Sequence, residues 1–564
     1  MRGQQQKLLI DTAFIGVAGA LGAQAFLLLL KACSSLLLGD LGGYRMPALS
    51  SENGIPHPAV GPHGLWLVPL ATTLGGLLTG LLVYGLAPEA EGHGTDAAVN
   101  AFHNLGGVIR ARVPLVKLVA SAITIGSGGS AGREGPVALV SAGMASLYAR
   151  LFHRTPPETR LLLLVGMASG LSAIFRSPIG TAIFAVEVLY SEGEFETGAL
   201  VFTLFGSIVA YALNGLFSGF QPLFEVPTTF TAPGVGTYGW YVLLGIACGT
   251  VAAVLPTSLY SMRDLFHRVP CPPHLKPAIG GLAVGVVGLV LPQLLGGGYS
   301  WIQSAITGSL PLYLMIFLAL GKILTFALTI GSGGSGGVFA PSLFTGAMLG
   351  AALSHLFHQP QAAFAVVGMA AVFGGAARVP IATILMAMQM TGGYQFLVPA
   401  GLAVVFSSIV ESLLTAPLRY KSLYERQVPT RADSPAHYVD EVRSALDLLR
   451  THNITGLPEA SSLELLSLLE SGVPLGLGDG KRLRIGILRP ESPCAGNPIE
   501  SGCLTGKEGE SEVVLIRRGG RTWWPGAGFQ LQGGDQVVVI ASEAGWQDLS
   551  GHLGPMDSAA PRTG

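Results

Sequence analysis

The sequence predicts an all-α polytopic membrane protein with a small α+β domain at its C-terminal end. Half of the 564 residues are hydrophobic and only 12% are charged, whereas about a quarter is usual in soluble proteins. The mean hydropathy is +0.54. Charged residues become frequent only after about residue 427. This change in composition predicts that a soluble cytoplasmic domain follows the membrane domain.

The first apolar segment follows a short basic start, Met1 to Lys7, and continues to about Leu38. It is longer than the roughly 7 to 15 residues of a secretory signal core, and no clear cleavage site follows it. We therefore predict that it forms the first membrane helix.

The later apolar segments are irregular in length. Several are shorter than the roughly 20 residues that a perpendicular membrane helix needs, and Gly or Pro interrupts others. This pattern predicts tilted, broken and re-entrant helices, which are tolerated where protein or a polar cavity covers the freed backbone groups. The segments lie at 63–86, 114–125, 136–152, 160–190, 197–217, 238–262, 275–296, 311–330, 339–358, 362–390 and 397–416.

The membrane part contains an internal repeat. The motif Gly-Ser-Gly-Gly-Ser-x-Gly at 126–132 returns at 331–337, an offset of 205 residues (331 − 126). A second motif, Val-Gly-Met-Ala at 165–168, returns at 367–370, an offset of 202 (367 − 165). Because the two motifs recur at nearly the same offset, the sequence predicts a duplicated membrane domain. In secondary transporters such repeats meet near the bilayer midplane, where the site lies.

These observations divide the chain into a duplicated membrane domain, a linker, a small domain and a tail. The predicted parts are a transmembrane domain at 1–427 with repeat halves at about 10–215 and 238–427, a helical linker at 428–479, a regulatory domain at 480–550 and a polar tail at 551–564.

Basic residues are unevenly distributed among the connecting segments. The connections at 218–237 and 355–361 contain neither Lys nor Arg. By the positive-inside rule, the basic segments and both termini are expected on the cytoplasmic side of an inner or plasma membrane. The basic segments lie at 110–117, 150–160, 263–276 and 419–426.

The Gly-rich stretch at 126–136 includes one carboxylate, Glu134, just before Pro136. A Gly-rich turn before a Pro that can start a helix exposes unpaired backbone N–H groups, which attract anions. An ionisable side chain in a membrane segment is costly and usually functional. The sequence therefore predicts an anion-binding site at which the Glu134 carboxylate competes with the anion for the same position. The alternatives are close helix packing through small residues and an ion pair with Arg133, although adjacent residues on a helix do not face each other.

Several other classes of function have little support in the sequence. The net charge of −1 does not indicate nucleic-acid binding. The five cysteines lack C-x-x-C spacing and predict neither a disulfide framework nor a zinc site. The stretch at 126–132 lacks the Gly-Lys-Ser/Thr end of a nucleotide-binding loop. We therefore expect a protein that is not an enzyme and needs no metal or cofactor.

Three motifs resemble the CLC family of chloride channels and chloride/proton antiporters. They are Gly-Arg-Glu-Gly-Pro at 132–136, Gly-Gly-Val-Phe-Ala-Pro at 336–341 and Ala-Pro-Glu-Ala at 87–90. The resemblance extends over roughly 10–427. It implies an inverted repeat, a homodimer with one pore per subunit, and bound chloride.

The resemblance also implies roles for individual residues. Glu134 corresponds to the gating glutamate of the family. The backbone amides of Val338 and Phe339 and the hydroxyl of Tyr420 would contact the central anion. The full set of implied chloride-binding residues is His93, Gly94, Arg133, Gly135, Val338, Phe339 and Tyr420.

Two positions depart from the better-known members of the family. His93 stands where a serine hydroxyl usually faces the anion. An imidazole N–H can still donate to chloride and can titrate near neutral pH, but the ring can also be a satisfied histidine at a loop end. Val188, after Glu187, replaces the glutamate that relays protons in the antiporters. This favours a channel over an antiporter. Glu187 itself is expected to be structural rather than a relay, because its repeat counterpart Gln389 is neutral.

The segment at 480–550 resembles the RCK C-terminal (TrkA-C type) regulatory domain. The similarity rests on Leu-Ile-Arg-Arg at 515–518, Pro525 and the Leu-x-Gly-Gly-Asp-x-Val-Val-Val run at 531–539. It implies a small-molecule ligand, so a ligand-gated regulator with secondary permeation is one alternative function. A cation permease is another alternative function, but the backbone N–H groups at the Gly-rich helix starts of the membrane region favour anions over cations.

Overall fold

The computed structural model describes residues 2–52, 57–227, 235–437, 475–476, 482–499, 504, 511–518, 521–523 and 529–554. The chain forms two compact units, Met1–Pro429 and Thr430–Gly564, which are described separately. Most of the predicted helical linker, from 438 to 474, lies outside the described residues.

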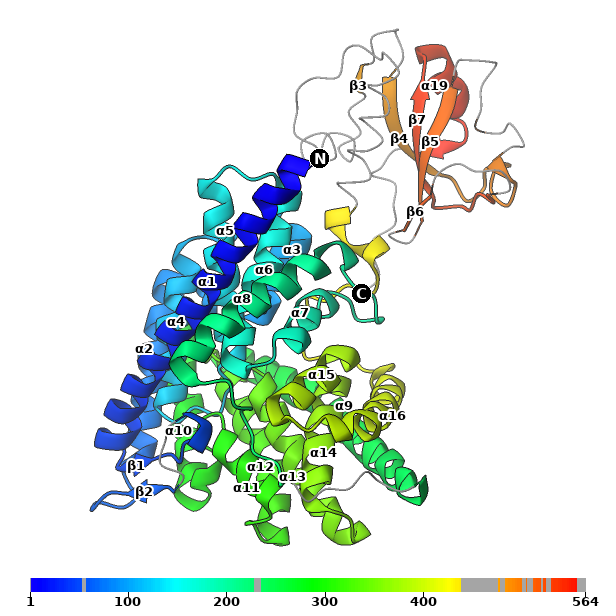
Figure 1. Cartoon of the computed structure of the whole chain (residues 1–564). Coiled ribbons are helices and arrows are strands. Elements are labelled where there is room, and N and C mark those ends of the chain that lie inside the picture. Colours follow the sequence, from blue (N-terminus) through cyan, green and yellow to red (C-terminus); the bar gives the residue numbers. More distant parts are fainter. Residues whose placement is uncertain are drawn as a thin grey trace. The chain divides into compact units, whose positions relative to one another are not determined.

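The first unit is mainly helical (Figure 1). Its first half comprises α1 (Arg2–Cys33), α2 (Val68–Leu86), α3 (Thr95–Asn104), α4 (Arg112–Gly126), α5 (Glu134–Leu151), α6 (Pro156–Phe175), α7 (Pro178–Glu187) and α8 (Leu200–Ser218). Its second half comprises α9 (Tyr238–Arg268), α10 (Lys276–Val290), α11 (Tyr299–Thr307), α12 (Leu312–Gly331), α13 (Phe339–Phe357), α14 (Gln361–Ala377), α15 (Pro380–Thr391) and α16 (Leu397–Thr415).

Shorter elements join these helices. α1 continues into a π-helix at Ser34–Leu41, and the strands β1 (Tyr44–Arg45) and β2 (Ala59–Val60) pair antiparallel. The 3-10 turns of this unit are Ser50–Glu52, Pro88–Ala90, Thr197–Ala199, Val235–Thr237, Pro273–Leu275, Pro292–Leu294 and Tyr394–Phe396, and the second unit begins with a further one at Arg431–Asp433.

The repeat in the sequence is a repeat in the structure. Helices α5 and α13 begin at Glu134 and Phe339, which are 205 residues apart (339 − 134). Two histidines at the same offset, His153 and His358, both adopt a left-handed backbone conformation beyond the ends of these two helices. Each helix of the first half therefore has a counterpart in the second.

The Arg-x-Pro-Ile motif of both halves is a break between two helices. Arg176 ends α6 and Arg378 ends α14, each with a positive φ, of 53° and 56°. Two residues later, Pro178 and Pro380 begin α7 and α15. Proline suits a first helical turn because its missing N–H has no partner there. The motif thus produces the short, broken helices that the apolar segments predict.

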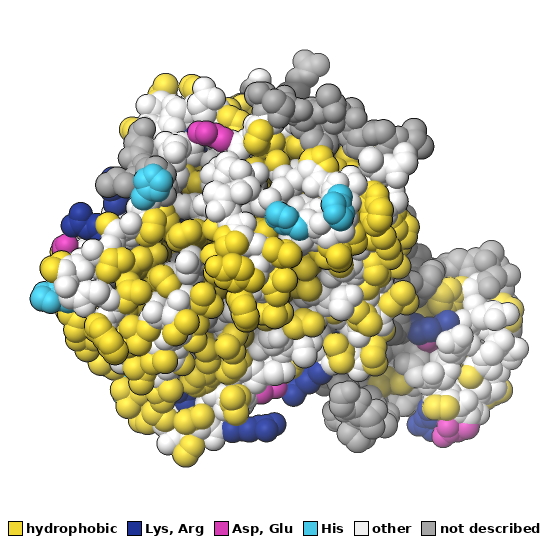
Figure 2. All heavy atoms as spheres, turned by 90° about the horizontal axis from the view of Figure 1, so that it is seen from below, with side chains coloured by type: hydrophobic (Ala, Val, Ile, Leu, Met, Phe, Trp, Pro, Cys, Tyr) yellow, Lys and Arg dark blue, Asp and Glu magenta, His cyan; other side chains and the backbone are white. Residues whose placement is uncertain are grey.

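The surface of the first unit suits a bilayer. In the part of the chain that the structure describes, nine helical segments are long and apolar enough to cross a membrane. Figure 2 shows hydrophobic side chains spreading over much of one face, with charged side chains near its margins. On α8 and α16, Leu216 and Leu413 are more than two-thirds exposed. Such an apolar surface is stable only when lipid or another protein covers it.

The second unit contains a small antiparallel sheet with strand order β3-β4-β7-β5-β6, and β8 also pairs with β4. Its elements are β3 (Leu475–Gly476), β4 (Arg482–Leu488), β5 (Ser511–Arg518), β6 (Arg521–Trp523), β7 (Gln536–Ala541), α19 (Glu543–Leu549) and β8 (Leu553–Gly554).

The centre of this sheet is apolar and has one buried ion pair. The side chains of Ile516, Val537 and Val539 are buried together. Asp535 is fully buried and accepts two hydrogen bonds from Arg518, of 2.7 and 2.8 Å. These hydrogen bonds raise the pKa of the Arg518 guanidinium. The Gly-Asp pair before β7 therefore closes a turn of the small domain.

Candidate anion-binding site

The two Gly-rich segments meet in the middle of the first unit. Gly132 and Gly337 exchange two backbone hydrogen bonds, of 2.8 and 2.6 Å. They are also repeat counterparts, 205 residues apart (337 − 132). Helix α5 begins two residues after Gly132, and α13 begins two residues after Gly337. The N-termini of two helices, each with a partial positive charge, are therefore brought together at this contact.

The Glu134 carboxylate lies at this junction. Its side chain is almost fully buried, and its Oε1 accepts a hydrogen bond of 2.5 Å from the Phe339 N–H. A side chain at Gly132 or Gly337 would collide with this carboxylate. The glycines in the two motifs are thus required by the close approach of Glu134, and the carboxylate occupies a position that suits a small anion.

His93 lies beside the first turn of α5. Its carbonyl oxygen packs so closely against Gly135 that a Cβ atom there would clash with it. The His93 ring is buried, and its Nε2 lies 3.2 Å from the Asp96 carboxylate. The next residue, Gly94, has a positive φ of 85° and begins α3. The predicted loop at His93 and Gly94 therefore does reach the residues around Glu134.

Arg133 lies on a different side of Glu134. Its Nη1 forms an ion pair of 2.7 Å with Glu52 Oε1, and its guanidinium lies 4.3 Å from the centre of the Tyr299 ring. The Arg133 side chain is only 6% exposed. Because this ion pair holds the guanidinium, Arg133 does not pair with its sequence neighbour Glu134. The alternative of a local Arg133–Glu134 salt bridge is not what the structure shows.

The described residues contain several buried polar atoms that have no hydrogen-bond partner of normal geometry. Five of these thirteen atoms belong to residues named above or to their neighbours: Glu134 Oε2, His93 Nδ1, Arg133 Nε and Nη2, and the Tyr299 hydroxyl. Buried polar groups are normally paired, so a cluster of exceptions calls for an explanation such as an ion or water that passes through.

Two buried lysines hold the loops near the site. Lys117 donates to the carbonyl oxygens of Ala90 (3.1 Å) and Gly92 (2.6 Å), in the loop before His93. Lys322 donates in the same way to Leu294 (3.1 Å) and Gly296 (2.6 Å).

The sequence analysis missed both lysines, although the sequence contained a signal for them. They are 205 residues apart (322 − 117), the offset of the Gly-rich repeat. Charged residues repeated at that offset inside apolar segments could have been found by the same comparison.

Glu187 is a helix cap. Its two carboxylate oxygens accept backbone hydrogen bonds from Ile381 (3.1 Å) and Ala382 (2.7 Å), in the first turn of α15. Its repeat counterpart Gln389 accepts from the backbone of Ile179 (3.1 Å) and Gly180 (2.9 Å), in the first turn of α7. Each half of the repeat therefore caps a helix of the other half. This contact supplies the structural role that the neutrality of Gln389 predicts for Glu187.

Val188 follows Glu187 as the C-terminal cap of α7 and is completely buried. Its backbone N–H donates to Phe184 in the last turn of the helix. It has no group that can carry a proton, as the sequence indicates.

The structure does not bring Tyr420 to the other site residues. The Tyr420 hydroxyl instead donates to Asp264 (2.7 Å). Tyr424 is the tyrosine that lies among the site residues, because its buried ring is 5.5 Å from the His93 ring and 6.3 Å from Phe184. The prediction named the wrong tyrosine because the two lie four residues apart in an irregular segment after α16, where no periodicity fixes which side chain points inward.

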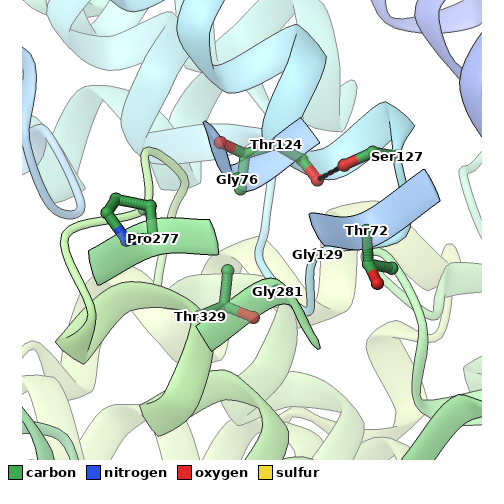
Figure 3. A pocket seen from close by; sticks show the side chains of 9 residues that line it. Thr72, Gly76, Thr124, Ser127, Gly129, Pro277, Gly281 and Thr329 are labelled. Atoms are coloured by element: carbon green, nitrogen blue, oxygen red, sulfur yellow. Dashed lines mark hydrogen bonds between the residues drawn. The ribbon is translucent and has the colours of Figure 1, made fainter. Parts of the chain in front are cut away.

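A small pocket lies near the Gly-rich segments but does not include Glu134 or His93 (Figure 3). It is lined by α2, α4, α10 and α12 with threonines such as Thr72, Thr124 and Thr329. Ser127 closes part of it by donating to the Thr124 carbonyl oxygen (3.0 Å). The small residues here permit close helix packing, which is the alternative role that the Gly-rich segments allowed.

Residues 75–412, more than half of the chain, match the family described as "Voltage gated chloride channel". The chain belongs to this family, the CLC family. The family match spans the whole junction between the two Gly-rich segments, and the protein is accordingly a multi-pass integral membrane protein.

Curated relatives within the CLC family are named as exchangers. The H(+)/Cl(-) exchange transporters ClcA of Salmonella arizonae and of Salmonella agona are each 31% identical to the chain over 383 residues, which is 65% of this chain and 80% of the relative.

Solved CLC structures share the fold of the first unit. A slow cyanobacterial Cl−/H+ antiporter has a TM-score of 0.63 at 23% identity, covering 74% of this chain and 96% of its own. A CLC-type fluoride/proton antiporter has a TM-score of 0.64 at 23% identity, covering 76% and 99%. The predicted inverted-repeat fold is therefore confirmed. That the second unit is an RCK C-terminal (TrkA-C type) domain stays a prediction.

Proposed function

We propose that this protein exchanges chloride for protons across the membrane, and that both ions compete through the Glu134 carboxylate. The observation that carries the proposal is the hydrogen bond of 2.5 Å from the Phe339 N–H to Glu134 Oε1. The carboxylate has the charge of a chloride ion and lies where two helix N-termini meet. The exchanger names of the Salmonella relatives support the same function.

The proposed mechanism follows from electrostatics. An ionised Glu134 occupies the junction and repels an anion that approaches it. A protonated Glu134 no longer needs the positive ends of α5 and α13, so it moves away and an anion takes its place. Several partial charges aimed at one point bind an anion without holding it as strongly as a full positive charge would, and turnover requires such release.

Several groups are proposed to contact the anion. The backbone at Gly135, Val338 and Phe339 lies at the two helix starts, and His93 with Gly94 lies beside them. Arg133 contributes positive charge next to Glu134, although Glu52 neutralises part of it. Tyr424 takes the place of Tyr420 in this set because its ring is the one beside His93. No metal or cofactor is required.

Exchange and channel conduction predict different voltages. Purified protein in planar bilayers or liposomes is placed under opposed chloride and pH gradients, and the reversal potential is measured. Exchange is supported when the reversal potential moves with the proton gradient at constant chloride. A reversal potential that equals the chloride Nernst potential at every pH excludes exchange and supports conduction through a channel.

The role of Glu134 has a separate test. Glu134→Gln keeps the shape of the side chain but cannot ionise. We expect chloride flux to continue without proton movement and to lose most of its pH dependence. If chloride flux, proton flux and pH dependence all match those of the unmodified protein, Glu134 is not the group for which the ions compete.

Further expectations concern assembly and regulation. The basic segments favour a cytoplasmic location for both termini and for the second unit. The apolar faces of α8 and α16 are proposed to contact lipid and a second copy of the chain in a homodimer. We further propose that the second unit is an RCK C-terminal-type domain that senses a small molecule and regulates transport.

A further inference from the structure

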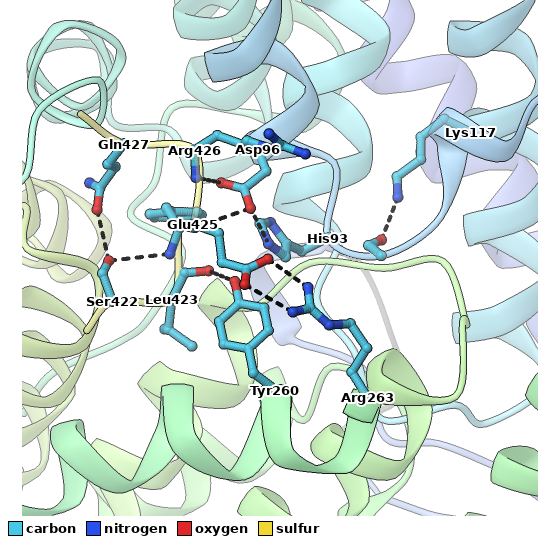
Figure 4. A network of polar contacts seen from close by, with 12 residues as sticks. His93, Asp96, Lys117, Tyr260, Arg263, Ser422, Leu423, Glu425, Arg426 and Gln427 are labelled. Carbon is cyan, nitrogen blue, oxygen red and sulfur yellow. Dashed lines mark hydrogen bonds and ion pairs between the residues drawn. The ribbon is translucent and has the colours of Figure 1, made fainter. Parts of the chain in front are cut away.

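The neighbours of His93 determine which of its ring nitrogens holds a proton. Nε2 lies 3.2 Å from Asp96 Oδ2. Asp96 also accepts backbone hydrogen bonds from Glu425 and Arg426, each 3.2 Å long, and it lies in the first turn of α3 (Figure 4). Two N–H donors and a helix N-terminus favour the ionised carboxylate. An ionised carboxylate only accepts hydrogen bonds, so Nε2 must be the donor.

This assignment leaves Nδ1 as a bare lone pair in the neutral ring. Nδ1 is buried, and no described residue pairs with it. A lone pair repels an anion, whereas a protonated Nδ1 is a charged donor. The serine hydroxyl that usually stands at this position donates at any pH, and His93 does not.

The surroundings of His93 place its ring next to Tyr424 and beside the first turn of α5. The ring lies edge-on to Tyr424, with 5.5 Å between the ring centres, and the His93 carbonyl packs on Gly135 at the start of α5. Lys117 fixes the same loop through the Gly92 carbonyl (2.6 Å). The ring is therefore held in position, and its free nitrogen is not turned toward bulk solvent.

The charge balance around His93 includes groups from every element that packs near it. Glu425 is neutralised by two contacts with Arg263, of 2.5 and 2.9 Å, and Asp96 is left to face the ring. The titratable and charged groups are Asp96, Lys117, Glu134, Tyr260, Arg263, Tyr424, Glu425 and Arg426.

We propose that His93 makes anion binding at its side of the site dependent on proton uptake, because chloride is accepted at Nδ1 only when the ring holds a second proton. One proton from water adds to Nδ1 and one chloride binds to it, so the pair enters without net charge. Asp96 is the positioning residue, since it keeps Nε2 protonated and stabilises the imidazolium. The inference rests on the proposed anion transport. It makes His93 a second residue that couples protons to chloride, in addition to Glu134, whereas Val188 cannot couple them.

The test separates His93 from Glu134. Both groups are proposed to take up protons, so the parent and all its variants contain Glu134→Gln, and the unmodified protein is titrated alongside them. Chloride binding is measured by isothermal titration calorimetry in detergent between pH 5.5 and 8.5. Two buffers with different ionisation enthalpies are used, so that proton uptake is counted directly. His93→Ser and His93→Asn are compared with the parent, and the folding of each variant is checked by gel filtration.

We expect the parent to lose chloride affinity as pH rises, approaching tenfold per pH unit, and to take up close to one proton per chloride. His93→Ser and His93→Asn should bind chloride with affinity that is nearly independent of pH and without proton uptake. Asp96→Asn should move the loss of affinity to lower pH. His103→Gln is the control because His103 is also buried, with its Nε2 3.1 Å from the Leu189 carbonyl oxygen; it should behave like the parent.

The outcomes that overturn the proposal are distinct. If the parent binds chloride equally at all pH values, or if His93→Ser takes up as many protons as the parent, His93 does not couple the ions. If neither the unmodified protein nor the parent binds chloride at any pH, the proposed chloride transport fails as well.

Discussion

Glu187 provides a sharp test, because the two roles that the sequence allows for it predict opposite effects of one substitution. As a helix cap, Glu187 needs acceptor oxygens but not a charge. Its counterpart Gln389 already performs the reciprocal task with an amide oxygen. Glu187→Gln should therefore keep proton and chloride transport, whereas Glu187→Ala should destabilise the membrane unit.

The size of the effect follows from the hydrogen bonds. Glu187 accepts two of them, of 3.1 and 2.7 Å, from the N–H groups of Ile381 and Ala382. Hydrogen bonds to a charged group contribute about 1.5 to 3 kcal/mol each. Glu187→Ala removes both and leaves two N–H groups unpaired, so a loss of about 3 to 6 kcal/mol is expected. Glu187→Gln keeps an acceptor and loses only the charge, so roughly 1 to 3 kcal/mol is expected.

The assay combines thermal unfolding in detergent with chloride and proton flux in liposomes. Gln389→Ala is the matched control, because it removes the reciprocal cap at α7 and should lower the unfolding temperature to a similar extent. The reasoning is refuted if Glu187→Gln abolishes proton flux while chloride flux and thermal stability are unchanged. In that case Glu187 carries protons and its position at α15 is incidental.

Two further predictions concern the surroundings of the site. Glu52→Gln removes the partner of the buried Arg133 guanidinium; we expect tighter chloride binding by a few fold, and Asp40→Asn, which breaks only an exposed ion pair, should leave the affinity unchanged. Tyr424→Phe should alter the ratio of nitrate to chloride flux because the ring lies beside His93. The same change at Tyr420 should leave this ratio unaltered, and the reverse result would restore Tyr420 to the site.

The sequence predicts the centre of the molecule well because the chemistry there is local and repeated. The Gly-rich motifs at 126–132 and 331–337 indicate both the duplication and the two helix starts, and Glu134 lies two residues after the first motif. Small residues are needed where two backbones approach within hydrogen-bond distance, so these positions leave a clear pattern. The neutral Gln389 predicts a structural role for Glu187, and Glu187 accepts two backbone hydrogen bonds at the start of α15.

Contacts between distant segments could not be predicted in the same way. Glu52 reaches Arg133 from a 3-10 turn that has no motif, and the choice between Tyr420 and Tyr424 depends on the path of an irregular segment. Val188 indicates a missing proton relay, but a single side chain does not decide between channel and exchanger. Other groups, such as His93, can supply a coupling that the replaced residue does not.

Three of the four buried glutamates in the described part of the membrane unit, Glu134, Glu187 and Glu411, differ in how their carboxylates are bonded. Glu187 has both oxygens bonded to backbone N–H groups, and Glu411 has both bonded to Arg378 and Thr415. Moving either carboxylate would break bonds at both oxygens, so each is fixed. Glu134 has one short bond, and its Oε2 has no partner among the described residues. When the Glu134 carboxylate leaves, the Phe339 N–H group that it releases is free for an anion. Of these three carboxylates, only Glu134 has an oxygen without a hydrogen-bond partner among the described residues, and we infer that it is the one that moves.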